Sequence, residues 1–188
     1  MMIREWEKLE YHDPEHILKG FREIAINLPL DTLPYSTASL RDRELRIYGE
    51  SRQCALFCYG MSKVLGVKVL YAHHEDSDYD FISFRVQNGT PYYTPVQMKE
   101  LVPKHINPTT SLEHEINKLK KYSVSNNLVV AMHMNRAGSF NLHEIKIPKL
   151  NFPALYFFGA KDSTQEKWHL IGNMLNNPKC HEFEYPKN

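Results

Sequence analysis

Apolar and polar residues alternate along the chain with two different periods, one typical of helices and one typical of strands. Residues 13–28 place apolar side chains at helical spacing behind an Asp-Pro pair, and both residue types are favoured where a helix begins. Residues 39–65 repeat this spacing over a longer stretch, which Gly66 ends. Ser39 and Asp42 resemble a capping box at its start. The first third of the sequence therefore predicts two helices.

A group of strand-like segments follows the second predicted helix. Residues 67–73 are a largely apolar run, and 78–84 and 92–99 are two further runs separated by Asn88-Gly89. An Asn-Gly pair favours a tight hairpin, although the following Thr90-Pro91 predicts a longer connection. These segments predict one strand and then a hairpin.

Helical and strand-like segments alternate in the remaining sequence. Residues 111–122 have helical spacing, and residues 128–134 are a continuous apolar run, as expected of a strand covered on both faces. Beyond them the pattern predicts strands at 142–147 and 154–158 and a final amphipathic helix at about 162–177. This order of elements predicts an α/β fold with a mixed central sheet and helices on both of its faces.

Composition narrows the class of protein. A length of 188 residues suits a single domain over residues 1–188, and 42% hydrophobic and 24% charged residues are typical of a soluble globular protein. The net charge of +1 means that a nucleic-acid surface would have to be a local patch. The chain has no membrane-spanning apolar run and no signal-peptide core, and its three cysteines form no CxxC pair. We therefore expect a cytoplasmic protein with reduced thiols and no membrane partner.

The predicted hairpin carries the most specific group of polar residues. Asp80 precedes the first of its two apolar runs, and Gln97 and Lys99 lie near the end of the second. Side chains alternate along a strand with a period of two, so Gln97 and Lys99 share one face, and Asp80 would lie across from them. A carboxylate, an amide oxygen and an ammonium group would thus come together, with the backbone carbonyl of Met98 close by. Such a group could hold a divalent cation beside a phosphate.

The second predicted helix contains a glutamate in an unusual position. On a helical wheel, Glu50 falls in the middle of the apolar face that begins with Ile47. A buried unpaired carboxylate is costly, so Glu50 needs a metal ion or a cationic partner such as Lys99. Glu44 lies away from this face and is the weaker candidate.

In this arrangement the chain resembles the PD-(D/E)XK nuclease superfamily, which has the restriction-endonuclease-like fold. The core of that family has the order αβββαβ, with a glutamate on the first helix, an aspartate on the second strand and a (D/E)-x-K element on the third. Glu50, Asp80 and Gln97-Met98-Lys99 match these positions, and the resemblance covers about residues 39–134. The segments before and after would be additions to this core. Gln97 stands where an acid is commoner in the family.

The resemblance implies a metal-dependent nuclease that hydrolyses phosphodiester bonds of DNA or RNA, with Mg²⁺ or Mn²⁺ as its cofactor. Asp80, the Gln97 amide oxygen and the Met98 carbonyl would hold the ion, and Glu50 would bind a second ion or orient water. Lys99 would position the attacking water or stabilise charge on the phosphoryl oxygens. The glutamine removes one negative charge, so metal binding should be weak. A homodimer is compatible with this interpretation.

Two other classes of protein fit the same residues. One is a nucleic-acid- or protein-binding module that keeps the nuclease-like fold without catalysis, and the other is an unrelated hydrolase that needs no metal. Taken singly, Asp80 could be an ordinary turn residue and Lys99 a solvated strand end. The lysines at 118, 120 and 121 are typical of a solvated helix face and would contact phosphate only if they border the site. The cysteines at 54 and 58 fit a packed core better than a nucleophile, and the histidines lack zinc-site spacing.

Overall fold

The computed structural model describes residues 5–74 and 76–188. Contacts divide the chain into two compact units: unit 1 comprises residues 1–73, 81–93 and 185–188, and unit 2 comprises residues 74–80 and 94–184. Seven strands pair in the order β1 to β7, with antiparallel and parallel neighbours, and β3 contributes residues to both units. The fold is therefore α/β with a mixed sheet, as predicted. The expectation of a single domain stays a prediction.

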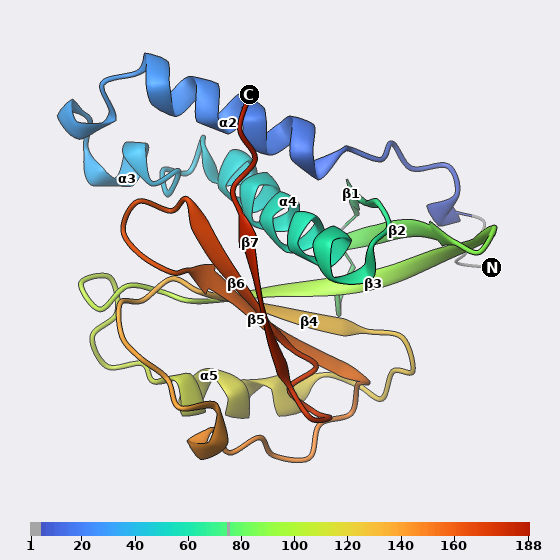
Figure 1. The fold of residues 1–188 in the computed structure, drawn as a ribbon. Helices are drawn as coiled ribbons and strands as arrows, with labels where there is room; N and C mark the ends of the chain where they lie inside the picture. The colour runs from blue at the N-terminus through green and yellow to red at the C-terminus, as the bar shows by residue number, and fades with distance from the viewer. Residues whose placement is uncertain (1–4, 75) are drawn as a thin grey trace. The chain divides into compact units, whose positions relative to one another are not determined.

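Unit 1 contains two long helices, α2 (Pro14–Asn27) and α4 (Arg46–Leu65), and between them the shorter η1 (Leu30–Thr32) and α3 (Tyr35–Ala38). Asp13 caps α2 as predicted, because its Oδ1 accepts a hydrogen bond of 3.0 Å from the backbone N–H of Glu15. Gly66 ends α4 with a left-handed φ of 66°, also as predicted. α2 and α4 lie side by side (Figure 1). No helix in the described part of the chain is long and apolar enough to cross a membrane.

The predicted start of the long helix at Ser39 is wrong, because the chain turns between α3 and α4. Asp42 Oδ2 accepts a hydrogen bond of 2.6 Å from the hydroxyl of Thr37, which precedes it, instead of capping a helix that follows. Leu40 adopts a left-handed φ of 57°, which a helix does not allow. α4 therefore begins only at Arg46.

A tight hairpin completes the strands of unit 1. β1 (Val69–His73) pairs antiparallel with β2 (Phe81–Gln87), and β2 leads into β3 (Thr90–Leu101). Asn88 and Gly89 form the turn with φ values of 51° and 76°, as in a type I′ turn. The longer connection predicted from Thr90-Pro91 is wrong, because both residues already belong to β3.

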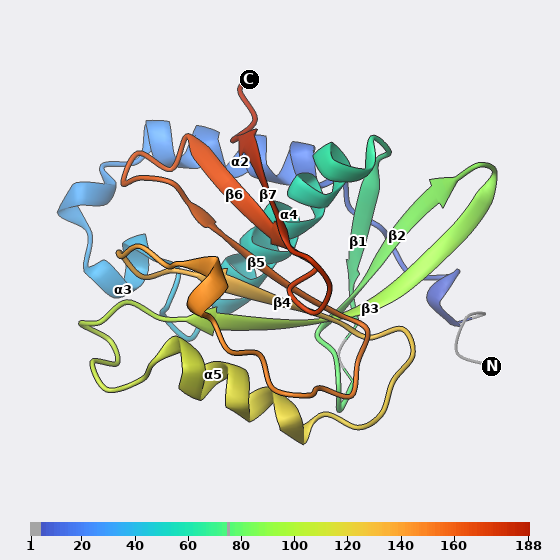
Figure 2. The same ribbon diagram turned by 60° about the horizontal axis from the view of Figure 1, so that its bottom comes forward.

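Unit 2 contains the rest of β3 and a sheet that continues to the last strand. Its other elements are α5 (Leu112–Lys118), η2 (Leu119–Lys121), β4 (Val129–Met134), η3 (Leu142–Glu144), β5 (Ala154–Ala160), β6 (Lys167–Gly172) and β7 (Lys179–Glu184). β4 is parallel to both β3 and β5, whereas β6 and β7 extend the sheet antiparallel. α5 lies in the crossover between β3 and β4, which parallel strands require, and runs alongside the sheet (Figure 2).

Two predictions for the last part of the chain are wrong. The strand expected at 142–147 is absent, since residues 142–144 form a 3₁₀ turn and 145–147 lie outside any helix or strand. The helix expected at 162–177 is replaced by β6 and the turn towards β7. Trp168 and Leu170 are buried while their neighbours are less so, which is the period of a strand. β6 pairs with β5 on one side and β7 on the other, and this pairing selects the extended conformation.

Candidate active site

Three of the four predicted catalytic residues come together in unit 2. Asp80 directly precedes β2, and its backbone N–H donates a hydrogen bond of 2.9 Å to the carbonyl of Val96 on β3. Asp80 therefore lies beside the part of β3 that carries Gln97 and Lys99. This is the arrangement that the period-two pattern predicted for these residues.

The carboxylate of Asp80 is held by donors from β3. Its Oδ2 accepts a hydrogen bond of 2.6 Å from the backbone N–H of Met98 and another from the side-chain amide of Gln97. The Gln97 Nε2 also donates to the carbonyl of Met98 over 3.3 Å. Gln97 is only 5% exposed, whereas Asp80 and Met98 are half-buried. The side-chain nitrogen of Gln97 therefore lies between two oxygens that point at it, the carboxylate Oδ2 of Asp80 and the backbone carbonyl of Met98.

Converging oxygens are what a hard cation requires. Gln97 would present its own carbonyl oxygen at the same point if its amide group turned by half a rotation. Among residues 5–74 and 76–188, no group of three or more His, Cys, Asp or Glu side chains could hold a metal ion. One carboxylate, one backbone carbonyl and one amide oxygen nevertheless fit a weakly held Mg²⁺, which takes one or two carboxylates and completes its shell with water and substrate phosphate.

Lys99 provides the positive charge of the site. It shares a strand face with Gln97, since the two lie opposite Met132 and Val130 of β4 in the parallel register. Burial lowers the pKa of Lys99; the charge of Asp80 opposes this shift, and the nearby Lys121 adds to it. A half-buried ammonium group with a lowered pKa gains from the approach of an anion.

Glu50 has a different environment in unit 1. Its Oε1 pairs with the Nε of Arg46 one helical turn earlier at 2.6 Å, and its side chain is 40% exposed. The predicted burial of this face is wrong for the start of α4, because Ile47 is 61% exposed and the buried part runs over residues 54–60. The convergence of Glu50 with the other three residues stays a prediction.

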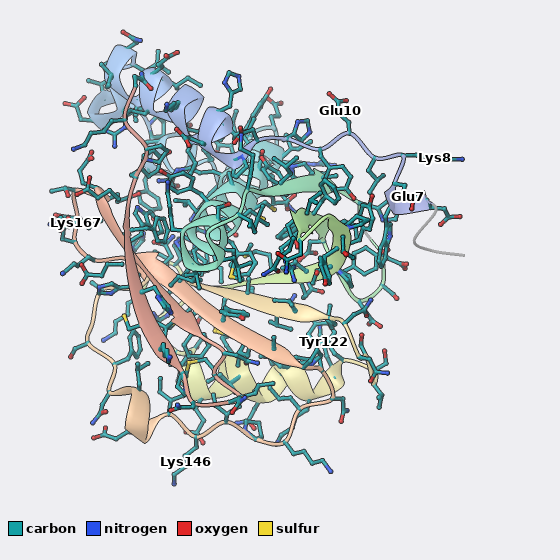
Figure 3. The ribbon with its side chains drawn as sticks, turned by 45° about the vertical axis from the view of Figure 1, so that its right-hand side comes forward. Glu7, Lys8, Glu10, Tyr122, Lys146 and Lys167 are labelled. Carbon is teal, nitrogen blue, oxygen red and sulfur yellow. The ribbon has the colours of Figure 1, made fainter. Side chains whose placement is uncertain are left out.

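Tyr122 is a site residue that the sequence analysis missed. It follows η2 at the end of α5 (Figure 3), and its side chain is 4% exposed. Its hydroxyl is buried and has no hydrogen-bond partner among the described residues. Burial raises the pKa of this hydroxyl, and the charges of Asp80 and Asp78 raise it further. Helical spacing of Tyr122 from the apolar Leu119 was the available signal, because it favours a buried tyrosine.

The segment that presents Asp80 is tied to the end of α5. Ser123 donates a hydrogen bond of 2.7 Å to the carboxylate of Asp78. Within the same loop, the rings of Tyr79 and His74 stack with centroids 5.8 Å apart, and the Tyr79 hydroxyl lies 3.3 Å from Nδ1 of His74. These contacts keep the loop before Asp80 close to Tyr122, whose ring lies against Lys99.

Comparison with known proteins identifies no relative of this chain. No family model, no curated protein and no solved structure gives a significant match. The functional argument therefore rests on the chemistry of the site.

That chemistry places two complementary features side by side. The oxygens of Asp80 and Met98 converge on one point that suits a cation, and Lys99 offers a positive charge on the same strand. A phosphate group can satisfy both, because its oxygens bind metal ions and accept hydrogen bonds from ammonium groups.

Proposed function

We propose that the protein is a metal-dependent nuclease that hydrolyses phosphodiester bonds of DNA or RNA. The observation that carries the proposal is the convergence of Asp80 and Met98 oxygens on the Gln97 amide, with Lys99 on the same strand face. The order α4, β1, β2, β3, α5, β4 supports it, because it matches the αβββαβ core of the PD-(D/E)XK superfamily and its restriction-endonuclease-like fold.

Asp80, Gln97 and Met98 would bind Mg²⁺ or Mn²⁺. The bound ion would supply positive charge to the phosphoryl oxygens. Asp80 is already oriented for this role, because the Met98 N–H holds its carboxylate. Gln97 would turn its amide so that the oxygen replaces the nitrogen at the point of convergence. Glu50 remains in the proposal as a second acid on the strength of the sequence pattern alone.

Lys99 would bind the phosphate directly. Burial destabilises its ammonium group, and an approaching phosphoryl oxygen stabilises it again by electrostatic attraction. This attraction grows as negative charge builds on that oxygen during attack by water. A group that binds more strongly as the charge develops accelerates the reaction and does not merely tighten binding.

A cleavage assay tests the proposal. Single-stranded DNA, double-stranded DNA and RNA are incubated with Mg²⁺, with Mn²⁺ or with chelator. We expect cleavage that needs millimolar-scale metal, stops in chelator and is lost in Lys99→Met. The matched control is Lys104→Met, which changes an exposed lysine of the same unit and should retain activity. Cleavage that survives chelator or the Lys99 substitution would overturn the proposal.

A binding module without catalysis is the second candidate function. The neutrality of Gln97 favours it, because the cluster then contains a single carboxylate for a divalent ion. If oligonucleotides bind but neither the wild type nor Gln97→Glu cleaves them with any metal, this second function replaces the first.

A further inference from the structure

Two lysines lie against the ring of one tyrosine beside the candidate site. The Nζ atoms of Lys99 and Lys121 are 5.7 and 5.2 Å from the centroid of the Tyr122 ring. Neither ammonium group forms an ion pair with a carboxylate in the part of the chain that the structure describes. Like charges brought together in this way create a positive potential that an anion can neutralise.

The nearby carboxylates are already bound to other groups. Glu115 accepts hydrogen bonds of 2.7 Å from Lys118 and from the hydroxyl of Thr110. Asp78 accepts its hydrogen bond from Ser123. Lys118 therefore has an internal partner, whereas Lys121, three residues later, has none within the described residues. The lysines at 118–121 thus differ in their partners, and Lys121 is the one that lies against Tyr122 beside the site.

The Tyr122 hydroxyl is the third unsatisfied group. A buried hydroxyl without a hydrogen bond costs stability, so such groups are rare unless a ligand uses them. The ring is held in place by Phe152, which it meets edge-on with centroids 6.3 Å apart. The backbone carbonyl of Tyr122 also accepts a hydrogen bond of 3.4 Å from Asn151. These contacts hold the ring and the backbone of Tyr122 against the segment at 151–152.

We propose that Lys121 and the Tyr122 hydroxyl, beside Lys99 at the cleaved phosphate, form a subsite for the neighbouring backbone phosphate of a nucleic acid. The inference rests on the proposed function and extends it by naming a second contact with the substrate chain. The Lys121 ammonium group and the Tyr122 hydroxyl would both donate hydrogen bonds to oxygens of this neighbouring phosphate, while Lys99 binds the cleaved one. Contacts of this kind fix the register of the chain and carry no base specificity.

The salt dependence of binding tests the charge of the subsite. A fluorescent single-stranded DNA oligonucleotide is titrated with protein in chelator at several salt concentrations, and log affinity is plotted against log salt. Loss of one phosphate contact lowers the slope by about 0.7. We expect this change in Lys121→Gln and not in Lys120→Gln or Lys104→Gln, which remove the same charge from exposed positions of the same unit. Equal slopes for all three variants would overturn the subsite.

The substitution Tyr122→Phe tests the hydroxyl separately. Since the hydroxyl has no internal partner, the variant should melt at the same temperature as the wild type or higher. It should bind the oligonucleotide more weakly at every salt concentration with an unchanged slope, because no charge is lost. A lower melting temperature with unchanged binding would show a structural role for the hydroxyl and overturn its part in the subsite.

The same measurements separate this inference from the proposed function. Binding is measured without metal, so it does not depend on cleavage. If no substrate is cleaved but Lys121→Gln and Tyr122→Phe weaken binding, the subsite stands and belongs to a binding module. If substrates are cleaved but Lys121→Gln binds as Lys120→Gln does, the nuclease stands and the subsite is wrong.

Discussion

Asp80 in unit 2 and Glu50 in unit 1 are both bonded to nitrogen donors, but the donors differ in kind. Asp80 is held by a backbone N–H of β3 and by a buried amide, whereas Glu50 pairs with a guanidinium group on a side chain that is 75% exposed. Water can replace an exposed partner at little cost, but a strand cannot move its N–H away. The comparison suggests a criterion for a catalytic carboxylate. Donors that hold it in a fixed position matter more than the presence of an ion pair.

The largest expected effect comes from Lys99→Met, which should lower the cleavage rate by at least about 10²-fold, because it removes a charge aimed at the developing negative charge. Oligonucleotide binding should weaken far less than the cleavage rate, since one phosphate contact is a small part of the footprint. Single-turnover cleavage and anisotropy measure the two quantities. Arg46→Met is the counterpart in the Glu50 region and should leave the rate unchanged; equal losses in both variants would contradict the comparison.

Asp80→Asn should abolish binding of Mn²⁺, as measured by isothermal titration in the presence of oligonucleotide. The carboxamide oxygen can still accept the hydrogen bonds from Met98 and Gln97, so the melting temperature should stay within a few degrees of the wild type. A large fall in melting temperature would assign Asp80 a structural role. Such a result would also remove the contrast with Glu50.

Gln97→Glu should tighten Mn²⁺ binding roughly tenfold, because it adds a negative ligand. In chelator the same variant should be less stable than the wild type, since a carboxylate replaces the amide that donates to Asp80 and two acids then face each other. Melting curves with and without Mn²⁺ measure this reversal. Stability that does not respond to metal would argue against an ion at this point.

The pH dependence of cleavage should reflect the lowered pKa of Lys99. The proposed mechanism requires the ammonium form, so the cleavage rate should fall as pH rises through a pKa below the ordinary value of 10.5. Lys121→Gln removes a repelling charge and should move this alkaline limb to higher pH. Stability should change in the opposite direction, because folding disfavours the charged form of Lys99. The free energy of unfolding of the wild type should therefore increase, relative to that of Lys99→Met, as pH rises through that pKa. An unchanged limb in Lys121→Gln would contradict this assignment.

The smallest effect on stability is expected at Glu50. Glu50→Gln removes an exposed pair of the i, i+4 type, which is worth about 0.3–0.5 kcal/mol in the free energy of unfolding. Urea denaturation measures this value. A cost of several kcal/mol would mean that Glu50 is buried against other groups, and the distinction between the two carboxylates would fail.

Local backbone chemistry accounts for the parts of the fold that the sequence predicted correctly. The N-cap at Asp13 and the left-handed ends at Gly66 and Asn88-Gly89 depend on neighbouring residues only. β6 could not be predicted in this way. Its apolar residues Trp168, Leu170 and Ile171 fit both a helical and a strand period, and only pairing with distant strands decides between them.

The same limit applies to the candidate site. The shared face of Gln97 and Lys99 follows from the alternation of side chains along one strand, so the sequence predicts it. The position of Tyr122 against Lys99 depends on how the crossover returns from β3 to β4, which no local pattern specifies. The burial of Glu50 was wrongly predicted because the helical wheel extended an apolar face beyond the residues that are covered.

The amide of Gln97 has a consequence for how an ion would enter. Its nitrogen bonds both Asp80 and Met98, so the metal-free cluster already satisfies itself and an incoming cation must first displace this donor. Binding of metal and binding of substrate would then favour each other, because phosphate oxygens add negative ligands to a coordination shell in which the protein supplies only one carboxylate. By thermodynamic reciprocity, nucleic acid would raise the affinity for metal by the same factor by which metal raises the affinity for nucleic acid. Such coupling would keep the proposed nuclease inactive until both metal and nucleic acid are bound.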